Sequence, residues 1–338
     1  MTPPLVVVDA DVLGRQRTGD ETYVENVLSR LPAAAGGEFR FAALTRRPDL
    51  VPADVDPVHV PARSQEARML RAVPRVLRRL GPALAHFQHA LPLSCPCPAV
   101  VTIHDLSFER DPSVMSARHR LVFRYAVPRG VRGAARIVAV SERTKRDLVD
   151  LYGVSPERVV VIPHGVDPAF SPGGAGGDSY LLLVGAVQQR KNPLAAADAA
   201  AVVGLRLVVV GPHRDPALVQ ELRRRGADVR GYVEKDELVR LYRGAAALVM
   251  PSRYEGFGLP VLEAMASGTP VVAAPDPALK EVAADAAVFV EPEDLAEGVQ
   301  RALGDREALV AAGLRRAAEF SWDDAARRTV AVYREVLA

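Results

Sequence analysis

The sequence predicts an α/β protein made of two Rossmann-like domains that face a cleft. Two observations lead to this prediction: short apolar runs alternate with helical patterns along the chain, and one glycine-rich tract interrupts the alternation near its middle. Buried apolar strands separated by helices are typical of parallel sheets with helices on both faces. The length of 338 residues is also sufficient for two domains of ordinary size.

The first domain is expected to span residues 1–168. Six apolar runs there have the length of buried strands, and four stretches repeat apolar residues at helical spacing. The expected strands are 5–9, 39–44, 84–87, 99–103, 137–140 and 159–162, and the expected helices are roughly 21–31, 66–79, 116–132 and 142–152.

The second domain is expected over residues 169–320. It opens with the tract 170–179, which is rich in glycine, proline and serine, cannot hold regular structure and is the best linker in the chain. A last helix is expected within 321–338, beginning near Trp322. Six further strands are expected at 180–184, 205–210, 229–233, 247–250, 270–274 and 287–290, with helices between them.

The composition is that of a soluble globular protein, with 49% apolar and 25% charged residues. A formal net charge of +2 gives no bulk attraction to nucleic acid, so no nucleic-acid partner is predicted. The sequence shows neither a signal peptide nor a long apolar span, and it has only two cysteines. We therefore expect a cytoplasmic protein without a disulfide framework.

Two histidines and two cysteines lie close together in the sequence, in the order His86, His89, Cys95 and Cys97. Their spacing is not one of the usual zinc finger or ribbon patterns, and three prolines crowd the segment. The sequence therefore predicts ordinary loop residues here and no metal site.

The most informative segment lies between the strands expected at 247–250 and 270–274. Gly256 and Gly258 let the backbone approach a ligand closely, and Pro260 suits the first turn of a helix. The N–H groups at such a helix start attract phosphate. Glu255 precedes the glycines and Glu263 lies on the helix, and carboxylates are poor phosphate ligands but good hydroxyl binders. This combination favours a nucleotide-sugar as the ligand.

The same segment resembles the Glu-x7-Glu signature of retaining glycosyltransferases of the family-four type, which have the GT-B fold. That fold has two Rossmann-like domains and a C-terminal helix that crosses back to the first domain. The resemblance implies that Glu255 contacts the transferred sugar near its reacting carbon and that Glu263 accepts hydrogen bonds from the ribose hydroxyls. It also implies donor contacts by the residues between them, namely Gly256, Phe257, Gly258 and Leu259.

A basic pair follows the first expected strand of the second domain. Arg190 and Lys191 lie where open parallel sheets bind ligands, and they could neutralise the charge that develops on a departing diphosphate. The segment resembles the family's Gly-x4-Arg-Lys-Asn diphosphate site. Ala186 occupies a position at which many relatives carry arginine, so either Arg190 compensates or one phosphate contact is missing.

Three further donor contacts are implied by resemblance alone. His104 belongs to a His-Asp pair that resembles the one whose histidine contacts the donor sugar in the family. Gly19 remains from the family's glycine-rich loop, in which Asp20 and Glu21 replace the usual residues and could face acceptor hydroxyls instead. Val233 lies in a segment similar to the family's base-binding turn.

The resemblance implies transfer of a mannose- or glucose-type hexose from a GDP- or UDP-type donor to a hydroxyl acceptor, as in polysaccharide biosynthesis. The acceptor would be a glycan, a lipid-linked sugar or a small molecule. No cofactor and no metal are implied, because Arg190, Lys191 and the helix start at Leu259 would neutralise the diphosphate. Two alternatives stay open: a GT-B sugar-nucleotide epimerase without an acceptor, and a two-domain binding protein without turnover.

Two segments of the first domain, 63–79 and 118–132, have arginine-rich helical faces. Such faces could dock on anionic lipid at the inner membrane face, as in relatives that glycosylate lipid acceptors. A solvated surface helix is the simpler interpretation, because charge runs usually mean only solvation. The sequence leaves the oligomeric state open.

Overall fold

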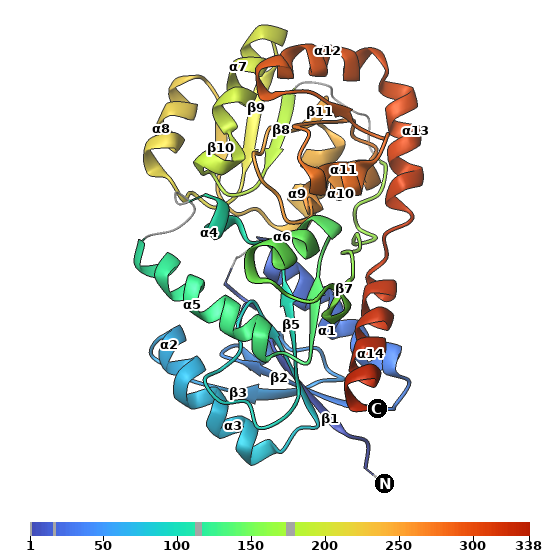
Figure 1. Ribbon diagram of the computed structural model, residues 1–338. Coiled ribbons are helices and arrows are strands. Elements are labelled where there is room, and N and C mark those ends of the chain that lie inside the picture. Colours follow the sequence, from blue (N-terminus) through green and yellow to red (C-terminus); the bar gives the residue numbers. More distant parts are fainter. Residues whose placement is uncertain (1, 16–17, 112–116, 174–179) are drawn as a thin grey trace. The chain divides into compact units, whose positions relative to one another are not determined.

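Figure 1 shows the computed structural model, which describes residues 2–15, 18–111, 117–173 and 180–338. The chain divides into two compact units. The first comprises most residues up to Gly165 together with Trp322–Ala338, and the second comprises Val166–Ser321 and a short segment that begins at Arg110. The predicted divisions after residues 168 and 320 lie close to these, and residues 174–179 of the predicted linker lie outside the described residues.

The first unit contains a 7-stranded parallel sheet in the order β3-β2-β1-β4-β5-β6-β7. The order reverses between β1 and β4, as in doubly wound folds. Its strands are β1 (Leu5–Asp9), β2 (Arg40–Thr45), β3 (Asp56–His59), β4 (Leu84–Gln88), β5 (Ala99–Ile103), β6 (Arg136–Ala139) and β7 (Val159–Val161).

Helices pack on this sheet through apolar side chains. α3 contributes Val73 and Leu77 to one core cluster, while α5 and α6 contribute Val127 and Leu148 to another. A π-helical turn over Arg68–Ala72 joins α2 to α3. The helices of the unit are α1 (Thr18–Ala35), α2 (Gln65–Ala67), α3 (Val73–Leu80), α4 (Ser107–Arg110), α5 (Ala117–Gly133), α6 (Glu142–Tyr152) and α14 (Trp322–Leu337).

The structure corrects three expectations for this unit. Strand β3 was not expected, because it is an exposed edge strand that contains a proline and has no apolar run. The single helix expected at 66–79 is instead two α-helical pieces around the π-helical turn. Helix α1 continues past Pro32 to Ala35, so the proline does not end it. Residue 116 of the helix expected at 116–132 lies outside the described residues.

The C-terminal helix α14 packs against the first unit, as predicted, and lies beside α1 (Figure 1). Trp322 is 2% exposed, and its ring lies 5.3 Å from that of His164. The Tyr333 hydroxyl lies 2.6 Å from Nδ1 of the buried His86. These contacts make the last helix part of the first unit's core.

The second unit contains a 6-stranded parallel sheet in the order β10-β9-β8-β11-β12-β13. Its strands are β8 (Tyr180–Val184), β9 (Arg206–Val210), β10 (Asp228–Arg230), β11 (Ala247–Met250), β12 (Val271–Ala273) and β13 (Val288–Phe289). Its helices are α7 (Pro193–Val203), α8 (Pro216–Arg224), α9 (Lys235–Arg243), α10 (Leu259–Ala266), α11 (Pro277–Ala283), α12 (Leu295–Gly304) and α13 (Arg306–Ala317).

The strand order of the second unit is 3-2-1-4-5-6 when its strands are numbered along the chain, which is the Rossmann order. The predicted fold class, two Rossmann-like α/β domains with a C-terminal helix returning to the first, is therefore confirmed. None of the helices among the described residues is both long enough and apolar enough to cross a membrane.

Replacing Trp322 by alanine should destabilise the first unit by about 3–5 kcal/mol, because it removes a buried aromatic ring and leaves a cavity. Leu121→Ala is the control, since that side chain is 73% exposed and its truncation should cost less than about 0.5 kcal/mol. Urea unfolding followed by circular dichroism measures both, because Trp322 is the chain's one tryptophan and fluorescence would be lost with it. Equal stability of the two variants would show that α14 is not part of the core.

Candidate active site

The sheet of the second unit collects charged side chains where its strand order reverses. Strands β8 and β11 are neighbours there, and their carboxyl ends lie at the same edge of the sheet. The chain leaves β8 through Gly185 and reaches Arg190 and Lys191, and it leaves β11 and reaches Glu255. In open α/β sheets this reversal point is where ligands bind.

Glu255 lies buried between two cations. Its Oε1 is 2.5 Å from Lys191 Nζ, and its Oε2 is 3.5 Å from Arg190 Nη1. The exposed fractions are only 6% for Glu255, 9% for Lys191 and 8% for Arg190. Burial alone would raise the pKa of Glu255, but Lys191 and Arg190 hold it below its usual value. Two cations contact this one carboxylate, an arrangement that suits an anionic ligand.

Backbone contacts tie the loops after β8 and β11 together. The Arg190 guanidinium donates a hydrogen bond to the carbonyl oxygen of Tyr254, and the Arg253 N–H donates to the carbonyl oxygen of Arg190 at 3.0 Å. Gly185 has a φ of +147°, and a Cβ built on it would lie 3.3 Å from Lys191 Cε. Glycine at this position therefore leaves room for the lysine stem that reaches Glu255.

The glycines after Glu255 set the start of helix α10. Gly258 has a φ of +111°, which strains any residue with a side chain, and a Cβ there would lie 2.7 Å from Leu279 Cδ2 and force that side chain to shift. The helix begins at Leu259 with Pro260 in its first turn, and none of the described side chains caps it. Its first-turn N–H groups are thus suited to a phosphate.

Glu263 lies on α10 and is 9% exposed. The Tyr242 hydroxyl donates a hydrogen bond to its Oε2 at 2.7 Å. Burial raises the pKa of Glu263 to about 7, although the hydrogen bond from Tyr242 acts in the opposite direction. The side chain therefore changes charge near neutral pH, and a ligand hydroxyl that donates to it would favour the ionised form.

Two other predicted donor contacts lie in the same unit. The sequence predicted a strand at 229–233, but strand β10 ends at Arg230. Residues 231–234 belong to no strand, so Val233 lies in the connection before α9. Phe257 is 5% exposed, and its ring lies 6.0 Å from that of Phe320, so packing already accounts for it. Donor contacts by Val233, Gly256, Phe257 and Leu259 stay predictions.

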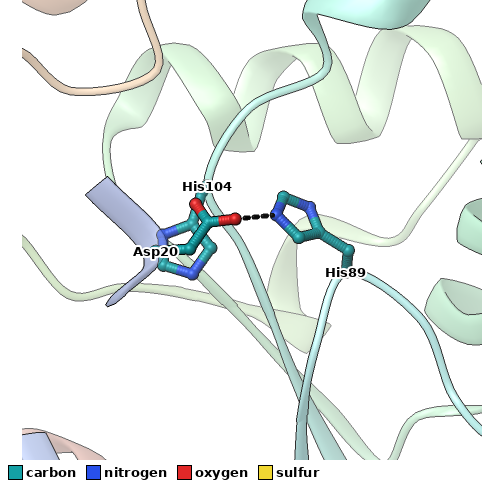
Figure 2. Close-up of side chains that lie close together, drawn as sticks. All are labelled: Asp20, His89 and His104. Atoms are coloured by element: carbon teal, nitrogen blue, oxygen red, sulfur yellow. Dashed lines mark hydrogen bonds and ion pairs between the residues drawn. The ribbon is translucent and has the colours of Figure 1, made fainter. Parts of the chain in front are cut away.

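Figure 2 shows a polar group in the first unit, formed by Asp20, His89 and His104. His104 directly follows β5 and is 8% exposed, and burial lowers its pKa to about 4, so it is neutral at pH 7. Its Nε2 lies 2.9 Å from Gln88 Oε1. Asp20 Oδ2 lies 3.3 Å from His89 Nε2. His104 thus belongs to a cluster that the sequence did not indicate, because its members come from three separate segments.

Gly19 was predicted in a loop, but it lies in the first turn of α1. A Cβ built on it would meet nothing within 4 Å, so packing of the described residues does not require glycine there. Glu21 accepts a hydrogen bond from the Gly14 N–H at 2.5 Å, which gives it a local structural contact. Arg17, from the same segment, lies outside the described residues.

The four residues of the cysteine-histidine segment do not assemble into one ligand set. Both ring nitrogens of His86 are engaged, Nδ1 with Tyr333 and Nε2 with the Thr102 hydroxyl at 2.7 Å. Cys95 and Cys97 have their sulfurs 3.8 Å apart. Only His89 of this segment joins a group with ligand geometry among the described residues, and that group is the one in Figure 2.

The predicted site residues thus fall into two groups. Nine of them lie in the second unit, in the loops after β8, β10 and β11 or on α10, whereas Gly19 and His104 belong to the first unit. Sequence reasoning missed the direct pairing of Lys191 with Glu255 and the Tyr242 partner of Glu263. The sequence around either residue does not indicate a long-range pair of this kind. A predicted strand order would have indicated that the loops after β8 and β11 are neighbours.

Comparison with known proteins identifies two sequence families. The model of "Glycosyl transferases group 1" matches residues 169–317, and that of "Glycosyltransferase Family 4" matches residues 17–170. The fold is that of solved glycosyltransferase structures. A sucrose-phosphate synthase from Thermosynechococcus elongatus superposes with a TM-score of 0.79 over 98% of each chain, at 20% identity.

Two curated relatives illustrate the sequence similarity. An O-antigen chain mannosyltransferase B from Escherichia coli is 28% identical over 266 residues, 70% of each chain. A D-inositol 3-phosphate glycosyltransferase from Acidothermus cellulolyticus is 34% identical over 254 residues, 62% of this chain and 57% of that one. The match therefore spans little more than half of the second relative.

The two family models, together with the fold, define a GT-B glycosyltransferase. Since the two family models together match residues 17–317, the chain belongs to the family-four, group-1 glycosyltransferases. The family predicted from the Glu-x7-Glu segment is thus confirmed.

The raised pKa of Glu263 predicts a pH-dependent loss of stability. A carboxyl whose pKa rises on folding, here from 4.5 to about 7, stabilises the protein fully below pH 4.5 and loses this contribution as the pH rises through 7. Relative to Glu263→Gln, the wild type should lose about 3 kcal/mol of unfolding free energy between pH 4.5 and pH 8. Urea unfolding at several pH values measures the difference, with the exposed Glu297→Gln as the charge-removal control. A difference that stays constant with pH would contradict the raised pKa.

Proposed function

We propose that the chain is a retaining, metal-independent hexosyltransferase that uses a nucleoside-diphosphate sugar and a hydroxyl acceptor. The donor is of the GDP or UDP type and carries a mannose- or glucose-type hexose. The observation that supports this most directly is the buried group of Arg190, Lys191 and Glu255 at the reversal point of the second sheet. Its two cations suit a diphosphate, and its carboxylate suits a sugar hydroxyl.

Each side chain has one role in the proposed reaction. Arg190, Lys191 and the N-terminus of α10 bind the diphosphate and stabilise the charge that grows as the bond from phosphate oxygen to the sugar's anomeric carbon breaks. The acceptor oxygen forms its bond to the same carbon on the same face, and the leaving phosphate takes the acceptor's proton. Glu263 binds the ribose hydroxyls, Glu255 binds the sugar, and His104 contacts the donor sugar.

A direct assay tests this function. The protein is incubated with GDP- and UDP-hexoses and a panel of glycan, lipid-linked and small hydroxyl acceptors, with excess chelator, and products are analysed for anomeric configuration. Transfer with retained configuration in the presence of chelator is expected. Donor isomerisation that no acceptor accelerates would favour the epimerase alternative, and ligand-induced thermal stabilisation without turnover would favour a binding protein. A rate lost with chelator and restored by manganese would contradict metal independence.

The two glutamates should separate donor binding from turnover. Glu263→Gln should weaken a nucleoside diphosphate and the corresponding nucleotide-sugar alike, by roughly 1.5–3 kcal/mol, because both ligands carry the ribose. Glu255→Gln should leave the nucleoside diphosphate bound at least as tightly, because Lys191 loses its carboxylate partner, while turnover falls by at least about tenfold.

Calorimetric titration of both variants with both ligands, together with initial rates, measures the contrast. The wild type and Glu297→Gln are the reference proteins. If Glu255→Gln weakens the bare diphosphate as much as Glu263→Gln does, the assignment of sugar to one residue and ribose to the other is wrong.

We also propose that the first unit makes peripheral contact with the anionic cytoplasmic face of a membrane. Helix α5 presents Leu121 and Tyr125, which are 73% and 72% exposed, four residues apart on one helical face. Arg124 lies beside them with its side chain 58% exposed. The combination of exposed apolar and basic side chains on a helix suits the boundary between headgroups and acyl chains. Residues 118 and 119 of the predicted basic face have side chains outside the described set.

Vesicle sedimentation tests this contact. The wild type should sediment with vesicles that contain phosphatidylglycerol, and the double variant Leu121→Ser, Tyr125→Ser should bind at least about tenfold more weakly. Val202→Ser is the matched control, because Val202 is 70% exposed on α7 of the second unit. Equal binding of the double variant and the control would contradict the assignment of α5 as the contact.

A further inference from the structure

Three side chains with metal-binding atoms meet where the strand order of the first sheet reverses. Asp20 lies on α1, which follows β1, and His89 follows β4, while His104 follows β5. These three strands are adjacent in the sheet. One carboxylate oxygen and one nitrogen of each histidine all lie within 4.8 Å of one another, and Figure 2 shows the Asp20 carboxylate directed at the His89 imidazole.

His104 has the protonation pattern of a metal ligand. Its Nε2 lies 2.9 Å from Gln88 Oε1, and because an amide oxygen only accepts, Nε2 carries the hydrogen. The lone pair is therefore on Nδ1, which is buried and has no hydrogen-bond partner among the described residues. A histidine that donates from one nitrogen to an oxygen and presents the other is the arrangement found around bound metals.

The distances are close to those of a coordinated ion. Bond lengths of 2.0–2.2 Å around tetrahedral zinc place ligand atoms about 3.3–3.6 Å apart. The edge from Asp20 to His89 already measures 3.3 Å. No two of the three ligand atoms are more than 4.8 Å apart, so side-chain shifts of about an ångström bring the other two ligand–ligand distances into the same range.

The cluster is also reachable from solvent. The side chains of His89 and Asp20 are 19% and 32% exposed, whereas His104 forms the buried side. His89 is held in a left-handed conformation with a φ of 62°, which is costly for a residue other than glycine, and its N–H donates to the Thr102 carbonyl at 2.9 Å. Three ligands with one open side leave a position for water or another small ligand.

A plain hydrogen bond between His89 and Asp20 would account for those two residues alone. It does not account for the buried Nδ1 of His104, whose ring centre lies 5.2 Å from that of His89. An ion bound to all three residues gives this nitrogen a partner.

We propose that Asp20, His89 and His104 form a binding site for a divalent transition-metal ion of the zinc type. Two imidazoles and a carboxylate are a ligand set that suits zinc, cobalt or nickel better than magnesium or calcium. The ion is not needed for transfer. Because it occupies His104, which the proposed function assigns to the donor sugar, it inhibits transfer, and this consequence rests on the proposed function.

Calorimetric titration of chelator-treated protein without a histidine tag tests the site, with zinc as the probe. The wild type should bind one ion per chain, and Asp20→Asn and His89→Ala should each weaken binding at least about tenfold, or 1.4 kcal/mol. His59→Ala, which removes an exposed histidine on β3, should bind as the wild type does. Circular dichroism of each variant confirms that it is folded.

Cobalt gives a second readout that does not depend on activity. Absorption typical of tetrahedral cobalt should appear in the wild type and in His59→Ala, and be lost in His89→Ala. Absence of stoichiometric zinc binding, or binding that Asp20→Asn and His89→Ala leave unchanged, would overturn the proposal. Zinc binding without loss of transfer would leave the site intact and contradict only the donor contact of His104.

Discussion

The reversal of strand order within each sheet is the constraint on which the chemistry of this protein depends. Where neighbouring strands send their connections to opposite faces, the loops at their carboxyl ends separate and leave room for a ligand. In the second unit this brings together Lys191 and Glu255, which are 64 positions apart in the chain. In the first unit the same arrangement brings Asp20 to His89, 69 positions away.

Burial then determines what these residues can do. Glu255 stays ionised at a 6% exposed position because two cations lie against it, and removing either partner would leave a buried charge poorly compensated. Burial raises the pKa of Glu263 to about 7, and no cation of the described residues forms an ion pair with it. Glu255 and Glu263 are eight positions apart, and their pKa values differ because their surroundings differ.

Much of the fold could be predicted, because parallel strands buried on both faces appear as apolar runs. β1, β5, β8 and β11 have the bounds that the sequence predicts, whereas the edge strand β3 has no such run and was missed. The candidate site was predictable where a motif is local, as at Glu255 to Glu263. The cluster at His104 was not, because it depends on the orientation of three separate loops and on a left-handed residue, His89.

The pairing of Lys191 with Glu255 also bears on how a donor would bind. The carboxylate lies 2.5 Å from the ammonium group in a buried place, so the pair holds the lysine in one orientation. A diphosphate carries more negative charge than one carboxylate and competes for the lysine. Exchange of partners would free Glu255 Oε1 to accept a hydrogen bond from a sugar hydroxyl, while Arg190 still compensates its charge. Binding of the diphosphate and positioning of the sugar are therefore expected to be coupled through this one pair.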